Sequence, residues 1–181
     1  MGMYRKEMRL RHYDYRSNGI YVVTICTYQR KCVLSKVICR ETCLTSIGEF
    51  VRQCWLEIPQ HFPCITLDKF IIMPNHLHGL IGIESNITAK QMSIAVGDVG
   101  ARHASPSSLS TQTASLGTII GQFKSAATRK AKEQTGENGV LWQRGVYEHI
   151  VRSESSLRAL REYVVNNPAQ WELDEENHSK R

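Results

Sequence analysis

Residues 70–81 read Phe-Ile-Ile-Met-Pro-Asn-His-Leu-His-Gly-Leu-Ile, an apolar run that Pro74-Asn75 interrupts just before His76 and His78. Proline and asparagine favour turns, so the pattern predicts two paired strands with the break between them. Alternate side chains of a strand lie on the same face of a sheet. The two imidazoles would therefore stand side by side on a rigid strand, which is half of a metal site.

The simpler alternative is that both histidines are half-exposed residues on the solvated face of an ordinary strand. The residues on either side of the pair are too apolar for such a strand. The apolar context therefore favours a pair of metal ligands, whose remaining partners must come from elsewhere in the chain.

The other segments alternate between short strands and helices. Residues 20–28 are rich in β-branched and aromatic residues, whereas apolar residues recur at helical spacing from Thr42 to about Ile58. The expected strands are 20–28, 65–73, 76–83 and 146–150, and the expected helices are 42–58, 116–133 and 155–166. No internal repeat is visible.

A stretch from about 85 to 117 interrupts this alternation. It has no aromatic residue and is rich in Ala, Ser, Thr and Gly, so it cannot bury much apolar surface. We interpret it as a mobile insertion within one domain, 1–171, because too little chain lies on either side to build two cores. Residues 172–181 are expected to form a short polar tail.

The chain carries a net charge of +6, which fits a protein that binds a polyanion. One basic cluster, with tyrosines among its residues, lies within the first sixteen residues, and a second spans 124–132. Such a mixture suits pairing with phosphates and stacking on exposed bases. The alternative to polyanion binding is that each cluster is an ordinary solvated surface or a loosely ordered end of the chain.

Neither a membrane span nor a disulfide framework is expected. The longest apolar runs, at 20–26 and 70–73, are far shorter than the roughly 18 residues that suggest a span. The first sixteen residues are charged and have no apolar core of a signal peptide. We therefore expect a cytoplasmic protein with no membrane partner, whose 6 cysteines stay reduced and, lacking a Cys-x-x-Cys pair, form no zinc knuckle.

The last expected helix contains Leu-Arg-Ala-Leu-Arg-Glu-Tyr-Val-Val-Asn-Asn-Pro at 157–168. At about 100° per residue, Tyr163 lies on the flank of the apolar stripe, and Asn167, four residues further on, shares its side of the helix. Pro168 disfavours helical geometry at Asn167 and would end the helix there. The alternative is that the tyrosine belongs to the core and the asparagine is a simple helix terminator.

Five motifs, taken in order, resemble the REP-associated tyrosine transposases, relatives of the single-tyrosine HUH transposases of bacterial insertion sequences. HUH denotes His, a hydrophobic residue and His. The motifs are Met73-Pro-Asn-His-Leu-His-Gly-Leu, Phe123-Lys-Ser, Leu141-Trp-Gln-Arg, Tyr147-Glu-His-Ile-Val-Arg and Tyr163-Val-Val-Asn-Asn-Pro-Ala-Gln-Trp. The resemblance implies an α+β, ferredoxin-like domain whose antiparallel sheet presents the two histidines on a central strand, with the last helix packed across them.

The resemblance also implies roles for single residues. Tyr163 would be the nucleophile, and His76, His78 and Asn167 would hold one divalent cation, Mg²⁺ or Mn²⁺, of which Mn²⁺ matches imidazole better. The substrate would be single-stranded DNA folded into REP-like hairpins, cleaved and rejoined through a 5′-phosphotyrosine without ATP. The candidate DNA contacts are Arg5, Arg9, Arg11, Lys124, Arg129, Arg144, His149 and Arg152. A monomer and a homodimer both stay open.

Two other functions are weighed against this one. The first is a domesticated, non-catalytic domain that binds hairpins without cutting them, against which the intact histidine pair, Tyr163 and Asn167 argue. The second is a two-metal hydrolase. Such an enzyme needs further Asp and His ligands, and residues 79–83, directly after the histidines, offer none.

Overall fold

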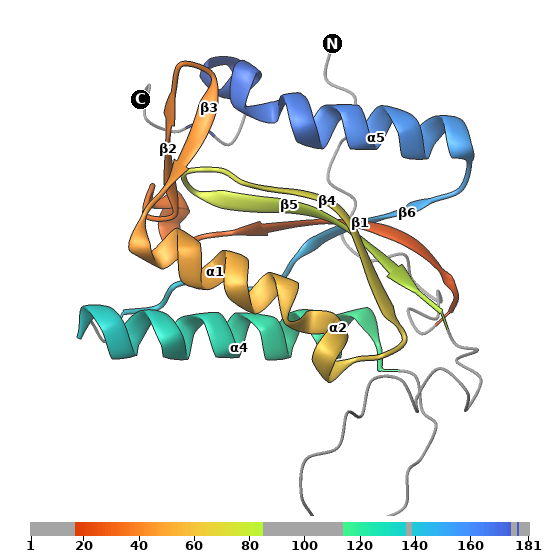
Figure 1. The fold of residues 1–181 in the computed structure, drawn as a ribbon, viewed down its shortest axis with the longest axis horizontal. Helices are drawn as coiled ribbons and strands as arrows, with labels where there is room; N and C mark the ends of the chain where they lie inside the picture. The colour runs from red at the N-terminus through yellow and green to blue at the C-terminus, as the bar shows by residue number, and fades with distance from the viewer. Residues whose placement is uncertain (1–16, 85–113, 137–138, 175–176, 178–181) are drawn as a thin grey trace, which may run out of the picture.

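The computed structural model describes residues 17–84, 114–136, 139–174 and 177 of the chain (Figure 1). The elements in chain order are β1 (Gly19–Cys26), η1 (Tyr28–Arg30), β2 (Ser35–Ile38), β3 (Glu41–Leu44), α1 (Ser46–Leu56), α2 (Ile58–His61), β4 (Ile65–Ile72), β5 (His76–Ile83), α4 (Leu116–Thr135), β6 (Tyr147–Val151), α5 (Glu154–Asn166) and η2 (Asn167–Leu173). Of the expected insertion, residues 85–113 lie outside the described residues, and residues 116–117 already belong to α4.

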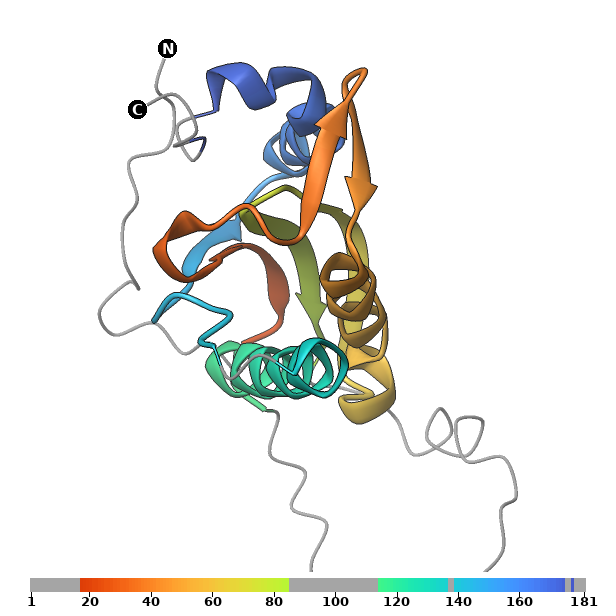
Figure 2. The ribbon, with the colours of Figure 1, turned by 90° about the vertical axis from the view of Figure 1, so that its left-hand side faces the viewer.

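The main sheet has four strands in the order β4-β5-β1-β6, and all of its neighbouring strands are antiparallel. With α1 between β1 and β4, and α4 between β5 and β6, this is the ferredoxin-like order. Helices α1 and α4 cover one face of the sheet and α5 covers the other (Figures 1 and 2). The predicted α+β fold class and the pairing of the two strands around Pro74-Asn75 are confirmed.

The larger core lies between the sheet and helices α1 and α4. Its centre is Trp55 of α1, which is fully buried and meets Phe123 of α4 edge to face with ring centroids 5.2 Å apart. A Cβ atom on Gly79 of β5 would lie 2.3 Å from the Trp55 ring. The glycine that follows the histidine pair is therefore required by the packing of this tryptophan on the sheet.

The smaller core lies on the opposite face, where Leu157, Leu160 and Val164 of α5 contact Val22 and Leu80 of the sheet. Because side chains alternate along a strand, the histidines of β5 share the face of Leu80 rather than that of Gly79. The fold thus places the two imidazoles between the sheet and the last helix.

The predicted helix over 42–58 was wrong at its start. Residues Glu41–Leu44 form β3, which pairs with β2 as a separate two-stranded ribbon. The helix begins only at Ser46, after Thr45, whose side chain accepts a hydrogen bond from the Gly48 amide. Pairing with β2 outweighs the helical spacing here, since β-branched and aliphatic residues also suit a strand.

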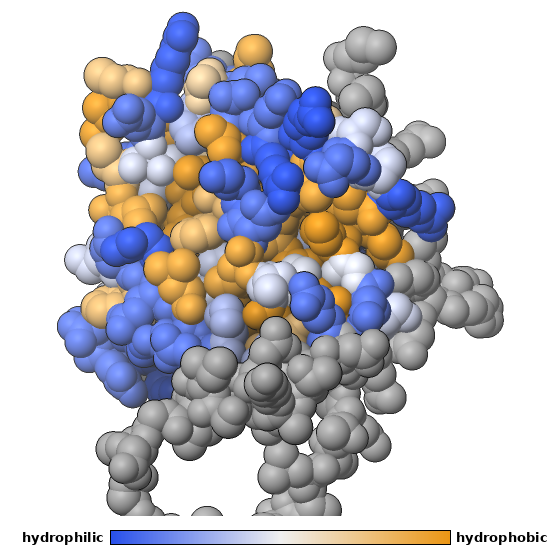
Figure 3. Space-filling view, turned by 45° about the vertical axis from the view of Figure 1, so that its right-hand side comes forward, coloured by the Kyte–Doolittle hydropathy of each residue, from blue (hydrophilic) through white to orange (hydrophobic). Residues whose placement is uncertain are grey.

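The surface mixes polar and apolar side chains. On the face shown in Figure 3, most of the apolar surface lies in the middle of the view, over the sheet, between α5 above and helices α1, α2 and α4 below. The outer strand β4 carries the half-buried apolar residues Leu67, Phe70 and Ile71. Within the described part of the chain, every helix is too short or too polar to cross a membrane.

Candidate active site

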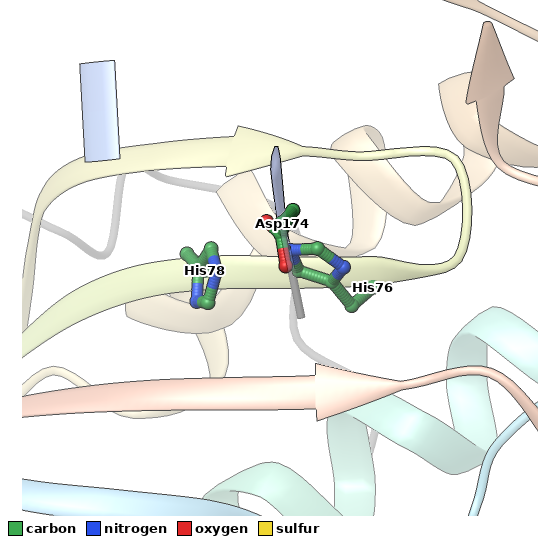
Figure 4. Close-up of side chains that lie close together, drawn as sticks. All are labelled: His76, His78 and Asp174. Atoms are coloured by element: carbon green, nitrogen blue, oxygen red, sulfur yellow. The ribbon is translucent and has the colours of Figure 1, made fainter. Parts of the chain in front are cut away.

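His76 and His78 lie side by side on β5, with ring centroids 4.4 Å apart (Figure 4). Their exposed fractions are only 0% and 5%. The alternative of two half-exposed histidines on a solvated strand is therefore wrong. Two imidazoles held together in a buried position are consistent with the predicted ligand pair.

A polar neighbour holds the Nδ1 atom of each ring. His76 Nδ1 lies 2.8 Å from Oδ1 of the buried Asn75. Because an amide oxygen only accepts, this contact favours the proton on Nδ1 and leaves Nε2 as the ring nitrogen for a ligand. His78 Nδ1 lies 2.8 Å from Oγ1 of Thr24 on the neighbouring strand. Metal-binding histidines are usually oriented by such a bond through the ring nitrogen that does not bind the metal.

Tyr163 reaches the pair from α5. Its hydroxyl lies 3.4 Å from His78 Nε2, and the two rings meet at a centroid distance of 5.3 Å. The residue is 44% exposed, so a ligand from solvent can approach it. A hydrogen bond also attaches α5 to strand β4 close to Tyr163 in the sequence: Arg161 Nε donates to Asp68 Oδ2 at 2.7 Å.

Asn167 follows α5 and is 2% exposed. Its Oδ1 atom is buried and, among the described residues, accepts no hydrogen bond. The prediction that Pro168 keeps Asn167 out of helical geometry was wrong, because Asn167 has φ −56° and ψ −40° and the chain continues directly into η2. A proline in the first turn of a helix disrupts no hydrogen bond, which explains this continuation. Its role as a metal ligand stays a prediction.

Asp174 is a neighbour of the histidines that the sequence did not reveal. One ligand atom each from His76, His78 and Asp174 lie within 4.8 Å of one another, and Figure 4 shows the carboxylate beside the two rings. Asp174 comes directly after η2, in the stretch expected to be a polar tail. Nothing in the local sequence pattern signals this position, because it depends on how η2 folds back toward β5.

The candidate DNA contacts divide into three groups. Arg5, Arg9 and Arg11 lie outside the described residues. Lys124 is partly buried, and its ammonium donates to the backbone carbonyls of Gln143, at 3.0 Å, and Gly145. Burial lowers its pKa from the ordinary value. The exposed members are Arg129, Arg144, His149 and Arg152.

Solved structures and related sequences place this fold among known proteins. A REP-associated tyrosine transposase, solved bound to a REP hairpin, matches with a TM-score of 0.53 and 15% identity, over 94% of this chain and 74% of that one. A protein of Haemophilus influenzae with the provisional name REP-associated tyrosine transposase is 27% identical over 157 residues, 86% of this chain and 73% of that protein. This chain resembles the REP-associated tyrosine transposases and has their fold.

A relative with higher sequence identity shows the family to which the chain belongs. An uncharacterized protein of Haemophilus influenzae is 38% identical over 175 residues, which are 95% of this chain and 92% of that protein. The chain belongs to the same family as that protein. No protein-family model matches it.

Proposed function

We propose that this protein is a transposase-like enzyme that cleaves and rejoins single-stranded DNA folded into hairpins, with Tyr163 as the nucleophile. The position of the Tyr163 hydroxyl, 3.4 Å from His78 Nε2 and beside a buried histidine pair, carries this proposal. The REP hairpin bound by the structural neighbour and the net charge of +6 of this chain support DNA as the substrate.

His76, His78 and Asn167 would hold one divalent cation, Mg²⁺ or Mn²⁺. The residues fit such an ion, since the Asn75 contact occupies His76 Nδ1 and leaves Nε2 for a metal, and the Asn167 Oδ1 atom is buried with no hydrogen-bond donor among the described residues. When bound, the cation would neutralise charge on a non-bridging oxygen of the scissile phosphate. This help is needed because a phenol, with a pKa near 10, is a weak nucleophile at neutral pH.

The reaction exchanges one phosphate ester for another. The Tyr163 oxygen attacks the phosphorus, the bond to the 3′-oxygen breaks, and the phenol proton leaves to water or to the leaving oxygen. The products are a 5′-phosphotyrosine and a free 3′-hydroxyl, and attack by a 3′-hydroxyl reverses the step and rejoins a strand without ATP. The exposure of Tyr163 gives the DNA access to this oxygen.

The DNA would continue from the site across β1 and β6. On β6, Tyr147 pairs with Thr24, which contacts His78, and His149 pairs with Val22. The side chains of Tyr147 and His149 therefore lie on the same face of the sheet as the two histidines. Arg144 and Arg152 are exposed just before and just after this strand. Cations and aromatic rings beside the site would hold phosphates and bases of the strand to be cut.

An adduct assay tests the proposal. The protein is mixed with single-stranded hairpin oligonucleotides and Mn²⁺, with the DNA labelled at either its 5′ or its 3′ end, and is then run on a denaturing gel. We expect a covalent adduct that keeps the 3′ label and releases the 5′-labelled fragment, and that requires the metal. Hairpin binding with no adduct under any metal would instead support the non-catalytic domain.

A further inference from the structure

We infer that Asp174 is a ligand of the same cation as His76 and His78, so that the metal centre contains a carboxylate supplied by the segment after η2. This inference rests on the proposed function, because it adds a residue to the metal site assumed there. The position of the side chain beside both rings is visible in Figure 4.

The distances suit one ion. Asp174 Oδ2 lies 3.9 Å from His76 Nε2, and a ligand atom of each of the three side chains falls within 4.8 Å of the others. Two atoms bound to one ion of the size of Mg²⁺ can lie up to about 4.2 Å apart, twice a bond of about 2.1 Å. The carboxylate and the His76 nitrogen are thus already within the span of one ion, and small side-chain rotations complete the group.

The charge of the site also favours a carboxylate. Two imidazoles and an amide are neutral donors, whereas Mg²⁺ in proteins is usually held by one or two carboxylates together with phosphate oxygens. The Asp174 side chain is only 7% exposed. A buried carboxylate loses much of its hydration, and a divalent cation offsets that cost.

Backbone hydrogen bonds fix the turn that carries Asp174, and a ring contact places the preceding Trp171 beside His76. Its amide donates to the Trp171 carbonyl at 3.2 Å, and its own carbonyl accepts from the Asn177 amide at 3.0 Å. The Trp171 ring lies beside His76 with centroids 6.1 Å apart. These contacts keep the Asp174 carboxylate beside the imidazoles of β5, and a metal ligand must be held in position in this way.

Binding of Mn²⁺ measured by titration calorimetry tests the assignment, with Asp174→Asn, which keeps the shape and removes the charge. We expect the affinity of this variant to fall by at least the about 10- to 100-fold typical of a lost supporting residue. Glu162→Gln is the matched control, because it removes one negative charge from an exposed position beside Tyr163 and should bind Mn²⁺ like the wild type.

The same titration separates this inference from the proposed function. If His78→Ala loses Mn²⁺ binding and Asp174→Asn keeps it, the carboxylate is not a ligand and the inference is overturned, while the histidine centre stands. If neither substitution affects Mn²⁺ binding, the metal centre itself is misassigned and the inference fails with it.

A measurement on the unaltered protein covers the case in which the variant does not fold. Addition of Mg²⁺ should shift the ¹³C carboxyl resonance of Asp174 and leave that of the distant, exposed Glu133 unchanged. An Asp174 resonance that does not move while the histidine resonances do would also overturn the inference.

Discussion

At the scale of single residues, the site depends on hydrogen bonds that fix the rings before any ligand arrives. Asn75 and Thr24 each hold an Nδ1 atom, and the imidazole faces are confined by burial between the sheet and α5. Side chains ordered in this way lose little further freedom when they bind a metal, which raises affinity.

Replacing His78 with Ala should abolish the stabilisation by Mn²⁺ and leave hairpin binding largely intact, because the proposed function assigns affinity for DNA to the basic surface. A ligand present at 100 times its dissociation constant stabilises the folded state by about 2.7 kcal/mol, and this increment should vanish. Thermal unfolding with and without Mn²⁺ measures it. His149→Ala, at an exposed position of β6, should keep the full effect, and an equal loss in both variants would contradict the ligand assignment.

Lys124 should leave a signature in the pH dependence of stability. Burial lowers its pKa from the ordinary 10.5, so between its folded-state pKa and 10.5 the unfolded chain binds more protons than the folded one. Stability must then rise with pH across that window. The unfolding free energy of the wild type minus that of Lys124→Met, measured in urea from about pH 8 to 10.5, should therefore increase. A flat or falling difference would show that the ammonium is not desolvated.

The sequence predicted the positions of those site residues that follow from the regular spacing of side chains along a strand or a helix. The spacing of two predicts a shared strand face for the histidines, and the helical angle predicts Tyr163 on the flank of its stripe; both positions are confirmed by their ring contacts. Asp174 was missed because its position depends on a turn formed after Trp171. Such a turn follows from tertiary packing and has no periodic signal.

At the scale of elements, strands with clear turn signals were predictable and the ribbon was not. The break at Pro74-Asn75 predicts the β4–β5 pair, which is observed. The β2–β3 ribbon instead turns at Cys39 and Arg40, with φ of 51° and 64°. Left-handed turns normally carry glycine or asparagine, so these two residues gave no hairpin signal.

Gly79→Ala tests how closely α1 packs on β5. The new methyl group would sit 2.3 Å from the Trp55 ring, which cannot move without disturbing Phe123. Overpacking of this kind costs about 1–3 kcal/mol of unfolding free energy. Gly121→Ala on α4 is the control, since its methyl group meets nothing within 4 Å and should stabilise the helix by roughly 0.5–1 kcal/mol. Equal effects in a denaturant titration would refute the packing described for Trp55.

At the scale of the whole molecule, α5 lies on one face of the sheet and α1 and α4 lie on the other (Figure 2). The outer strand β6, next to β1, carries the exposed His149. The net charge of +6 would extend the attraction for the proposed DNA substrate beyond the few residues proposed to touch it. Recognition of the DNA is therefore expected to be separable from the chemistry.

Hairpin binding should weaken steeply with salt and exceed the binding of perfect duplex of the same sequence. Each phosphate contact adds about 0.7–0.9 to the slope of log affinity against log salt, so Arg144→Ala with Arg152→Ala should reduce the slope by about 1.5. Fluorescence anisotropy from 50 to 300 mM salt measures both quantities. An unchanged slope would contradict phosphate contacts of Arg144 and Arg152, and equal affinity for duplex would contradict the preference for hairpins.

The most direct test of the central claim is to locate the DNA on the protein by mass spectrometry of the trypsin-digested adduct. Tyr163 is the only tyrosine of the tryptic peptide 162–180, and Tyr147, a rival phenol on β6, is the only one of peptide 145–152. The account predicts the phosphodiester on peptide 162–180 and no adduct at all from Tyr163→Phe. DNA on peptide 145–152, or an adduct that persists in Tyr163→Phe, would contradict it.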